Sequence, residues 1–107
     1  MICRQQDVSA KDLGKGVTRK ILATGGGLMT VEFHFDRGSV GSPHSHPHEQ
    51  VGYVVSGKFA FTLAGTTTVL APGDSYYVPS GVVHGAEALE EGVLLDVFTP
   101  QREDFLA

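Results

Sequence analysis

Residues 44–50 read HSHPHEQ, which gathers three imidazoles, a carboxylate and an amide within seven positions. Histidine is a common metal ligand because its neutral imidazole offers a lone pair at neutral pH. His44, His46 and His48 stand at every second position, just ahead of the apolar run VGYVVSG. Taken alone, this stretch is compatible with either a metal site or a polar loop.

A second segment supplies a further histidine from elsewhere in the chain. Residues 73–84 read GDSYYVPSGVVH, in which a short apolar run leads to Pro79, Gly81 and His84. Proline and glycine at this spacing favour a tight turn. Such a turn would deliver His84 from a different strand, so a metal site becomes the favoured interpretation of the histidines.

Strands joined by tight turns would have to position these side chains. Short runs rich in Val, Thr, Phe and Tyr lie between glycines, a pattern typical of an all-β sandwich or barrel. The expected strands are 17–23, 28–35, 50–56, 58–63, 66–71, 74–78, 83–88 and 92–98. Gly65 indicates a hairpin between two of them. One helical turn is expected at 8–14, capped by Ser9, and another in the C-terminal REDFLA.

The composition limits the classes of protein and partner. A length of 107 residues with 41% hydrophobic side chains fits one globular domain, and the net charge of −4 gives no sign of a nucleic-acid partner. The lone cysteine, Cys3, cannot form an internal disulfide, which fits a reducing compartment. No apolar run is long enough for a signal peptide or a membrane span. We therefore expect a cytoplasmic protein without a membrane partner.

The two histidine segments resemble the paired motifs of the cupin superfamily. The first cupin motif is glycine, five residues, H-x-H, three or four residues, glutamate, six residues and glycine, and residues 38–57 are similar to it. The second is glycine, five residues, P-x-G, two residues, histidine, three residues and asparagine. Residues 73–88 follow it, with Ala88 in place of the asparagine. The resemblance implies a single-domain double-stranded β-helix, or jelly-roll barrel, over residues 1–107, with one metal ion at the barrel mouth.

The resemblance implies that the ligands are His44, His46, Gln50 and His84. Gln50 stands where most relatives carry glutamate, and Glu49 is a rival ligand that leaves seven residues before Gly57 instead of six. A neutral amide would leave the full charge on the ion, which favours anionic substrates and Lewis-acid chemistry. The metal could be nickel, zinc, iron, cobalt or manganese. His48 is expected at the rim or behind the ligands, and His34 in solvent.

A second unusual stretch, GVLLDVFTPQREDFL, covers residues 92–106. Strand alternation places Leu94, Asp96 and Phe98 on one face. A carboxylate among buried apolar residues costs several kcal/mol unless it is paired or solvated. Asp96 is therefore either a structural ion-pair or hydrogen-bond partner, or a general acid or base facing the cavity, and we favour the second. Arg102 is either a surface side chain or a clamp for a substrate carboxylate.

Five segments together resemble the small pectin-degradation cupins called KdgF: RKILA (19–23), HSHPHEQ, YVVSGKF, PSGVVHG and DVFTPQREDFL. The resemblance implies an enzyme, usually a homodimer, that converts 4,5-unsaturated uronate monosaccharides to the linear ketonised form. It assigns acid–base chemistry to Asp96 and substrate contacts to Phe98 and Arg102. The small anionic sugar would also need an apolar wall, to which we expect Tyr53 or Tyr76 to contribute.

Alternative functions remain open from the sequence. An iron-dependent dioxygenase on the same scaffold would consume oxygen, and a sugar isomerase or epimerase is a further enzymatic possibility. A binding or sensing cupin would retain its ligand unchanged. The origin of the uronate, from pectin or from alginate, is also open.

Overall fold

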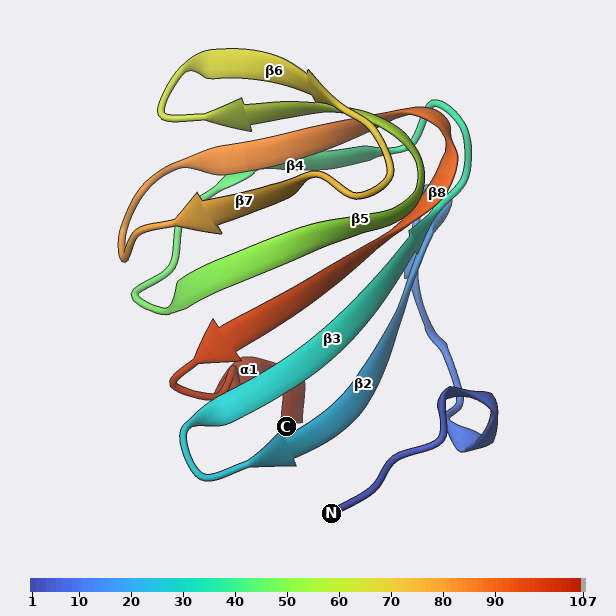
Figure 1. Cartoon of the computed structure of the whole chain (residues 1–107), viewed down its shortest axis with the longest axis vertical. Coiled ribbons are helices and arrows are strands. Elements are labelled where there is room, and N and C mark those ends of the chain that lie inside the picture. Colours follow the sequence, from blue (N-terminus) through green and yellow to red (C-terminus); the bar gives the residue numbers. More distant parts are fainter. Residues whose placement is uncertain (107) are drawn as a thin grey trace.

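The computed structural model describes residues 1–106 and consists almost entirely of antiparallel strands (Figure 1). In chain order the elements are a 3₁₀ helix (Gln5–Asp7), β1 (Lys11–Gly14), β2 (Val17–Gly25), β3 (Leu28–Phe35), β4 (Val40–His44), β5 (Glu49–Leu63), β6 (Thr66–Leu70), β7 (Ser75–Val78), β8 (His84–Thr99) and α1 (Glu103–Leu106). The all-β jelly-roll barrel predicted from the sequence is confirmed.

The two longest strands, β5 and β8, pair with one another and organise the barrel. Their register runs from Glu49 opposite Thr99 to Leu63 opposite His84. The first half of β5 is flanked by β7 and the second half by β6, while β8 pairs first with β4 and then with β3. Strands β2 and β1 continue the sheet beyond β3. Figure 1 shows β5 and β8 curving from one half of the barrel into the other.

Two glycines allow β5 and β8 to bend where they cross. Gly57 has φ of +83°, and a Cβ there would lie 2.5 Å from the Glu91 carbonyl oxygen. A Cβ at Gly92 would lie 2.3 Å from the Ser56 carbonyl oxygen. The strand boundaries predicted at these glycines are wrong, because both strands continue through a bend with a shifted register.

The N-terminal segment also differs from the prediction. The helical turn expected at 8–14, capped by Ser9, is absent; residues Lys11–Gly14 form β1, which pairs with β2. Strand β4 was missed because its sequence, VGSPH, contains glycine and proline, which are rare in strands. The hairpin at Gly65 is confirmed, with φ of +84° at that residue. The C-terminal turn is confirmed by α1, and Ala107 lies outside the described residues.

Alternate side chains of the strands fill the interior of the barrel. The buried apolar residues are Val17, Met29, Val31, Phe35, Val54, Phe59, Phe61, Tyr76, Val78, Ala88, Leu94 and Phe98. Burial of this apolar surface is the main favourable contribution to folding. Among the described residues, no helix has the length and apolarity needed to cross a membrane.

Candidate active site

Three histidines from separate parts of the chain converge in the barrel. His44 ends β4 and His84 begins β8, and the two residues are opposite each other in the β4–β8 pairing. His46 follows in the connection to β5. The ring centroids are 4.4 Å apart for His44 and His84, and 4.9 Å for His46 and His84. One nitrogen from each ring lies within 4.8 Å of the others, as a shared metal ion requires.

Main-chain carbonyls fix the orientation of all three rings. Each Nδ1 donates to a carbonyl oxygen two residues away: His44 to Ser42 (2.9 Å), His46 to His48 (3.0 Å) and His84 to Val82 (3.0 Å). A carbonyl only accepts hydrogen bonds, so each Nδ1 carries the proton and each Nε2 keeps a free lone pair. The set therefore presents three lone pairs to one point.

The free nitrogens fit a cation. Among residues 1–106, Nε2 of His84 is buried and has no hydrogen-bond partner. Burial is the largest cause that lowers the pKa of both His46 and His84, and so both imidazoles are neutral and able to coordinate. A buried lone pair without a donor is costly, and a divalent transition metal at this point would remove that cost.

The structure places Gln50 with the histidines and Glu49 away from them. Gln50 is 5% exposed, and its Oε1 lies 3.1 Å from Nε2 of His46. Both atoms are acceptors, and about 3 Å is the separation of two adjacent ligands on one ion at ordinary bond lengths. Glu49 is exposed and accepts a 2.6 Å hydrogen bond from the hydroxyl of Tyr77 outside the barrel. The arrangement supports the predicted preference for Gln50.

Asp96 is a buried carboxyl beside this cluster. It is 4% exposed, and its Oδ1 accepts a 2.7 Å hydrogen bond from the hydroxyl of Tyr76. Burial raises the pKa of Asp96 from 3.8 to about 6, while hydrogen bonds from Tyr76 and Gln50 and the charge of Arg102 act in the opposite direction. The pKa of Tyr76 is raised well above 10, chiefly by burial, so its hydroxyl stays protonated.

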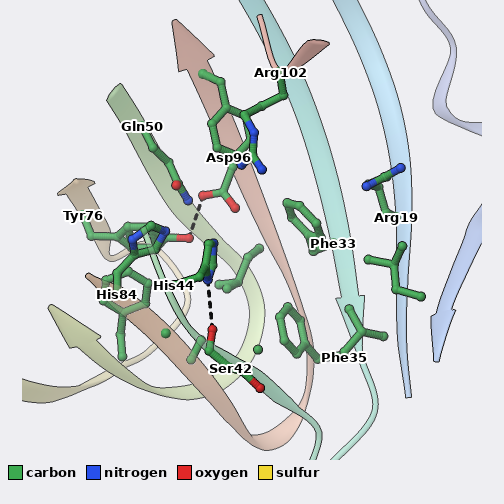
Figure 2. Close-up of a pocket in the computed structure, with 18 of the residues that line it drawn as sticks. Arg19, Phe33, Phe35, Ser42, His44, Gln50, Tyr76, His84, Asp96 and Arg102 are labelled. Carbon is green, nitrogen blue, oxygen red and sulfur yellow. Dashed lines mark hydrogen bonds between the residues drawn. The ribbon is translucent and has the colours of Figure 1, made fainter. Parts of the chain in front are cut away.

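A cavity of about 260 Å³ joins these groups. Figure 2 shows His44 and His84 on one side of Asp96, with Arg102 and Arg19 on the other. The predicted residues that line the cavity are His44, Gln50, Tyr76, His84, Asp96, Phe98 and Arg102. An electrophilic metal position and a carboxyl with a pKa near neutrality therefore face the same space, which suits proton transfer on a bound substrate.

Arg102 is buried near the cavity and is bonded to a neighbour. Its Nε and Nη2 donate to the two carboxylate oxygens of Asp104 at 3.0 and 2.8 Å. Its guanidinium carbon is 5.2 Å from the ring centroid of Phe98. Of the two tyrosines expected in an apolar wall, Tyr76 lines the cavity. Tyr53 is 48% exposed on the outer face of β5 and does not line the cavity, so the structure gives no support to its predicted contact with the substrate.

The remaining histidines lie outside the cluster. His48 is half-buried, and its main-chain carbonyl, rather than its ring, orients His46. His34 is partly exposed, with Nε2 3.3 Å from a carboxylate oxygen of Glu91. Arg19, on β2, lines the cavity but was not predicted as a site residue. Its position two residues after Val17, on the inward side of a predicted strand, was the available signal.

Comparisons with known proteins agree with this geometry. Residues 31–98 match the cupin domain family model. The chain is 43% identical over 98 residues to the pectin degradation protein KdgF of Dickeya dadantii, covering 90% of this chain and 89% of the relative.

Two solved structures have the same fold over nearly the whole chain. An RmlC-like cupin from Shewanella frigidimarina superposes with a TM-score of 0.94 at 41% identity, over 97% of this chain and 94% of the other. KdgF from Halomonas sp. also gives a TM-score of 0.94 at 41% identity, over 98% and 97% of the two chains. The similarity therefore covers the two histidine segments and the C-terminal strand together.

Proposed function

Since the chain belongs to the cupin family and is similar to KdgF along most of its length, we propose that it is a metal-dependent enzyme of pectin or alginate breakdown. Its substrate would be a 4,5-unsaturated uronate monosaccharide, which it converts to the linear ketonised form. The observation that carries the proposal is the single cavity in which a buried carboxyl, Asp96, faces the convergent histidines.

The reaction is an isomerisation that balances without a co-reactant. The bond between the anomeric carbon and the ring oxygen breaks, and the anomeric hydroxyl loses its proton as an aldehyde forms. The ring oxygen keeps the electron pair of the broken bond and becomes an enolate, and this enolate becomes a ketone when C4 of the sugar gains a proton. One proton therefore leaves an oxygen and one proton reaches a carbon, which a single carboxyl can mediate.

Asp96 is suited to both proton transfers. Its pKa of about 6 lies close to neutral pH, so the carboxylate can accept the hydroxyl proton and the acid can return it to carbon. The Tyr76 hydroxyl and the Gln50 amide both hydrogen-bond to the carboxyl and hold it in place beside the cavity. A divalent transition metal on His44, His46, Gln50 and His84 would supply a Lewis acid for the substrate oxygens.

The sugar would lie between apolar and cationic side chains. Phe98 is almost completely buried and forms part of the cavity wall. Because Asp104 accepts from Nε and Nη2 of Arg102, the Nη1 edge of that guanidinium is available to an anionic substrate. These contacts support a small anionic sugar as the ligand.

The decisive experiment follows the absorbance of an unsaturated uronate monosaccharide, whose conjugated chromophore disappears on ketonisation. Metal-loaded protein should accelerate the loss, a chelator should abolish the acceleration, and Asp96→Asn should reduce it by about 10²–10⁴-fold. The variant Glu49→Gln, which changes an exposed neighbour, is the matched control. Oxygen uptake would instead identify a dioxygenase, and recovery of unchanged ligand a binding protein; either result would contradict the proposal.

A second copy of the chain is the proposed partner. Val51, Tyr53 and Val55 lie on the outer face of β5 and are each about half exposed, and Tyr77 lies beside Val51 on β7. A homodimer would cover this apolar face. Light scattering of the wild type and of Tyr53→Asp tests the assignment, because a dimer held by this face should dissociate in the variant.

A further inference from the structure

Arg19 is a second arginine in the cavity, and it lies apart from the sequence motifs that define the metal site. It stands on β2, is 9% exposed and lines the same cavity as Asp96 and His84. Figure 2 shows it beyond Phe33, on the side of Asp96 that is away from His84. An arginine buried in a barrel interior requires a counter-charge or a set of acceptors.

Arg19 and Arg102 share one aromatic ring. The guanidinium carbon of Arg19 is 4.1 Å from the ring centroid of Phe105, and that of Arg102 is 4.2 Å from the same centroid. The ring face stabilises a nearby cation, but it does not satisfy the N–H donors of a guanidinium. The two arginines therefore hold two positive charges at one end of the cavity.

Within the described residues, Asp104 is the only carboxylate that hydrogen-bonds to this pair. Asp104 accepts two hydrogen bonds from Arg102, and those bonds are the main cause that lowers its pKa. Arg19 has no side-chain hydrogen bond or ion pair in residues 1–106. Burial is the main cause that lowers its pKa; the charge of Asp104 raises the pKa and that of Arg102 lowers it. Asp96 is hydrogen-bonded to Tyr76, and the charge of Arg102 also acts on it. Within the described residues, Arg19 therefore keeps its N–H donors available to an anion at this end of the cavity.

We propose that Arg19 is an anion anchor whose guanidinium binds the carboxylate of the sugar in the cavity. This assignment rests on the proposed function for the identity of the sugar. Arg102 has its Nε–Nη2 edge committed to Asp104, whereas Arg19 can present a complete fork to a carboxylate. The carboxylate of the substrate then lies at the arginine end, and its ring extends toward Asp96 and the metal ligands.

A purely structural role for Arg19 makes a different prediction. If the side chain only packs on Phe105, its removal should lower thermal stability without changing which ligands bind. If Arg19 is an anion anchor, its removal should weaken the binding of acidic sugars and leave that of neutral sugars unchanged. Ligand discrimination therefore separates the two roles.

The test is calorimetric titration of metal-loaded protein with galacturonate, a saturated and unreactive uronate, and with the neutral hexose galactose. Wild type should bind galacturonate more tightly than galactose. Arg19→Met keeps the apolar stem and removes the charge, and it should weaken galacturonate binding by roughly 30-fold while galactose binding is unchanged. Arg37→Met, at an exposed arginine, has the same change in net charge and should bind both sugars as wild type does.

Equal galacturonate affinity in wild type and Arg19→Met would overturn the anchor, as would a wild type that does not discriminate between the two sugars. If Arg19→Met fails to fold by thermal melting, Arg19→Lys decides the question. It keeps the charge but loses the fork, so weaker galacturonate binding supports the anchor and unchanged binding overturns it. Because galacturonate does not react, selective binding without chromophore loss in the uronate assay would refute the proposed reaction and leave the anchor standing.

Discussion

The hydroxyl of Tyr76 donates a 2.7 Å hydrogen bond to Asp96 across an intervening strand. Gly52 on β5 is paired with Tyr76 on one side and with Asp96 on the other. A Cβ at Gly52 would lie 2.0 Å from the Tyr76 ring, so only glycine leaves the ring room to cross β5. The ring of Phe61 stacks on the ring of Tyr76, with the two ring centroids 4.0 Å apart. Gly52 thus positions the donor that orients the proposed catalytic carboxyl.

Gly52→Ala should displace Tyr76 and so disturb the orientation of the Asp96 carboxyl. We expect a loss of stability of about 1–3 kcal/mol from overpacking, together with a lower kcat.

Removing the Tyr76 hydroxyl by Tyr76→Phe should raise the pKa of Asp96, because that hydrogen bond lowers it. Activity that depends on the carboxylate should then rise at higher pH than in wild type.

The pH–rate profile of the double variant tests this chain of contacts. If Gly52 acts through the Tyr76 hydroxyl, Gly52→Ala should not shift the profile further in the Tyr76→Phe background. Gly27→Ala is the control, since a Cβ there meets nothing closer than 3.6 Å. An unaltered profile in Gly52→Ala alone would contradict the positioning role.

Asp96→Asn should stabilise the metal-free protein while it abolishes most activity. The folded-state pKa of about 6 lies above the unfolded value of 3.8, so the folded state binds the proton more tightly. The carboxyl therefore costs stability as pH rises from about 4 to about 6, and the full cost of about 3 kcal/mol is present at pH 8. Near pH 4.5 the cost should shrink to about 1 kcal/mol.

Chemical denaturation in the presence of a chelator measures this difference. Asp96→Asn should exceed wild type in unfolding free energy at pH 8 and approach it near pH 4.5. The same difference at both pH values would show that the gain does not come from the ionised carboxyl.

The histidine cluster was predictable because the spacing of His44, His46 and His84 relative to glycines and Pro79 resembles the paired cupin motifs. The structure brings these three histidines together. The continuity of β5 through Gly57 was not predictable in the same way. Gly57 permits either a turn or a bend, and the choice depends on the contact with β8, which is distant in sequence.

Tyr53 and Tyr76 differ in how far their positions could be predicted from the sequence. Once Gln50 faces inward, alternation along β5 places Gly52 and Val54 inward and Tyr53 outward, so the outward position of Tyr53 could have been deduced. The contact between Tyr76 and Asp96 could not, because it depends on the relative register of β7, β5 and β8. Register between strands depends on tertiary packing and turn geometry.

Gln50→Glu should change the charge at the proposed metal position. A carboxylate among three imidazoles should raise metal affinity, and it should raise the KM for an anionic sugar because the centre becomes less positive. Glu49→Gln should change neither quantity, since Glu49 is exposed and bonded to Tyr77. Metal titration and steady-state kinetics measure the two effects. Loss of metal in Glu49→Gln, with retention in Gln50→Ala, would reverse the assignment of the ligand.

Metal removal should destabilise the fold through the convergent histidines. A ligand that binds only the folded state at about 100 times its Kd adds about 2.7 kcal/mol, which corresponds to roughly 10–20 °C in Tm for a chain of this size. Addition of a chelator should therefore lower the Tm of wild type, whereas His84→Ala should show no response because its metal position is incomplete. His34→Ala, at the partly exposed histidine beside Glu91, should respond to the chelator as wild type does. A chelator response retained in His84→Ala and lost in His34→Ala would place the stabilising ion in the surface group of His34, Asp36 and Glu91 instead.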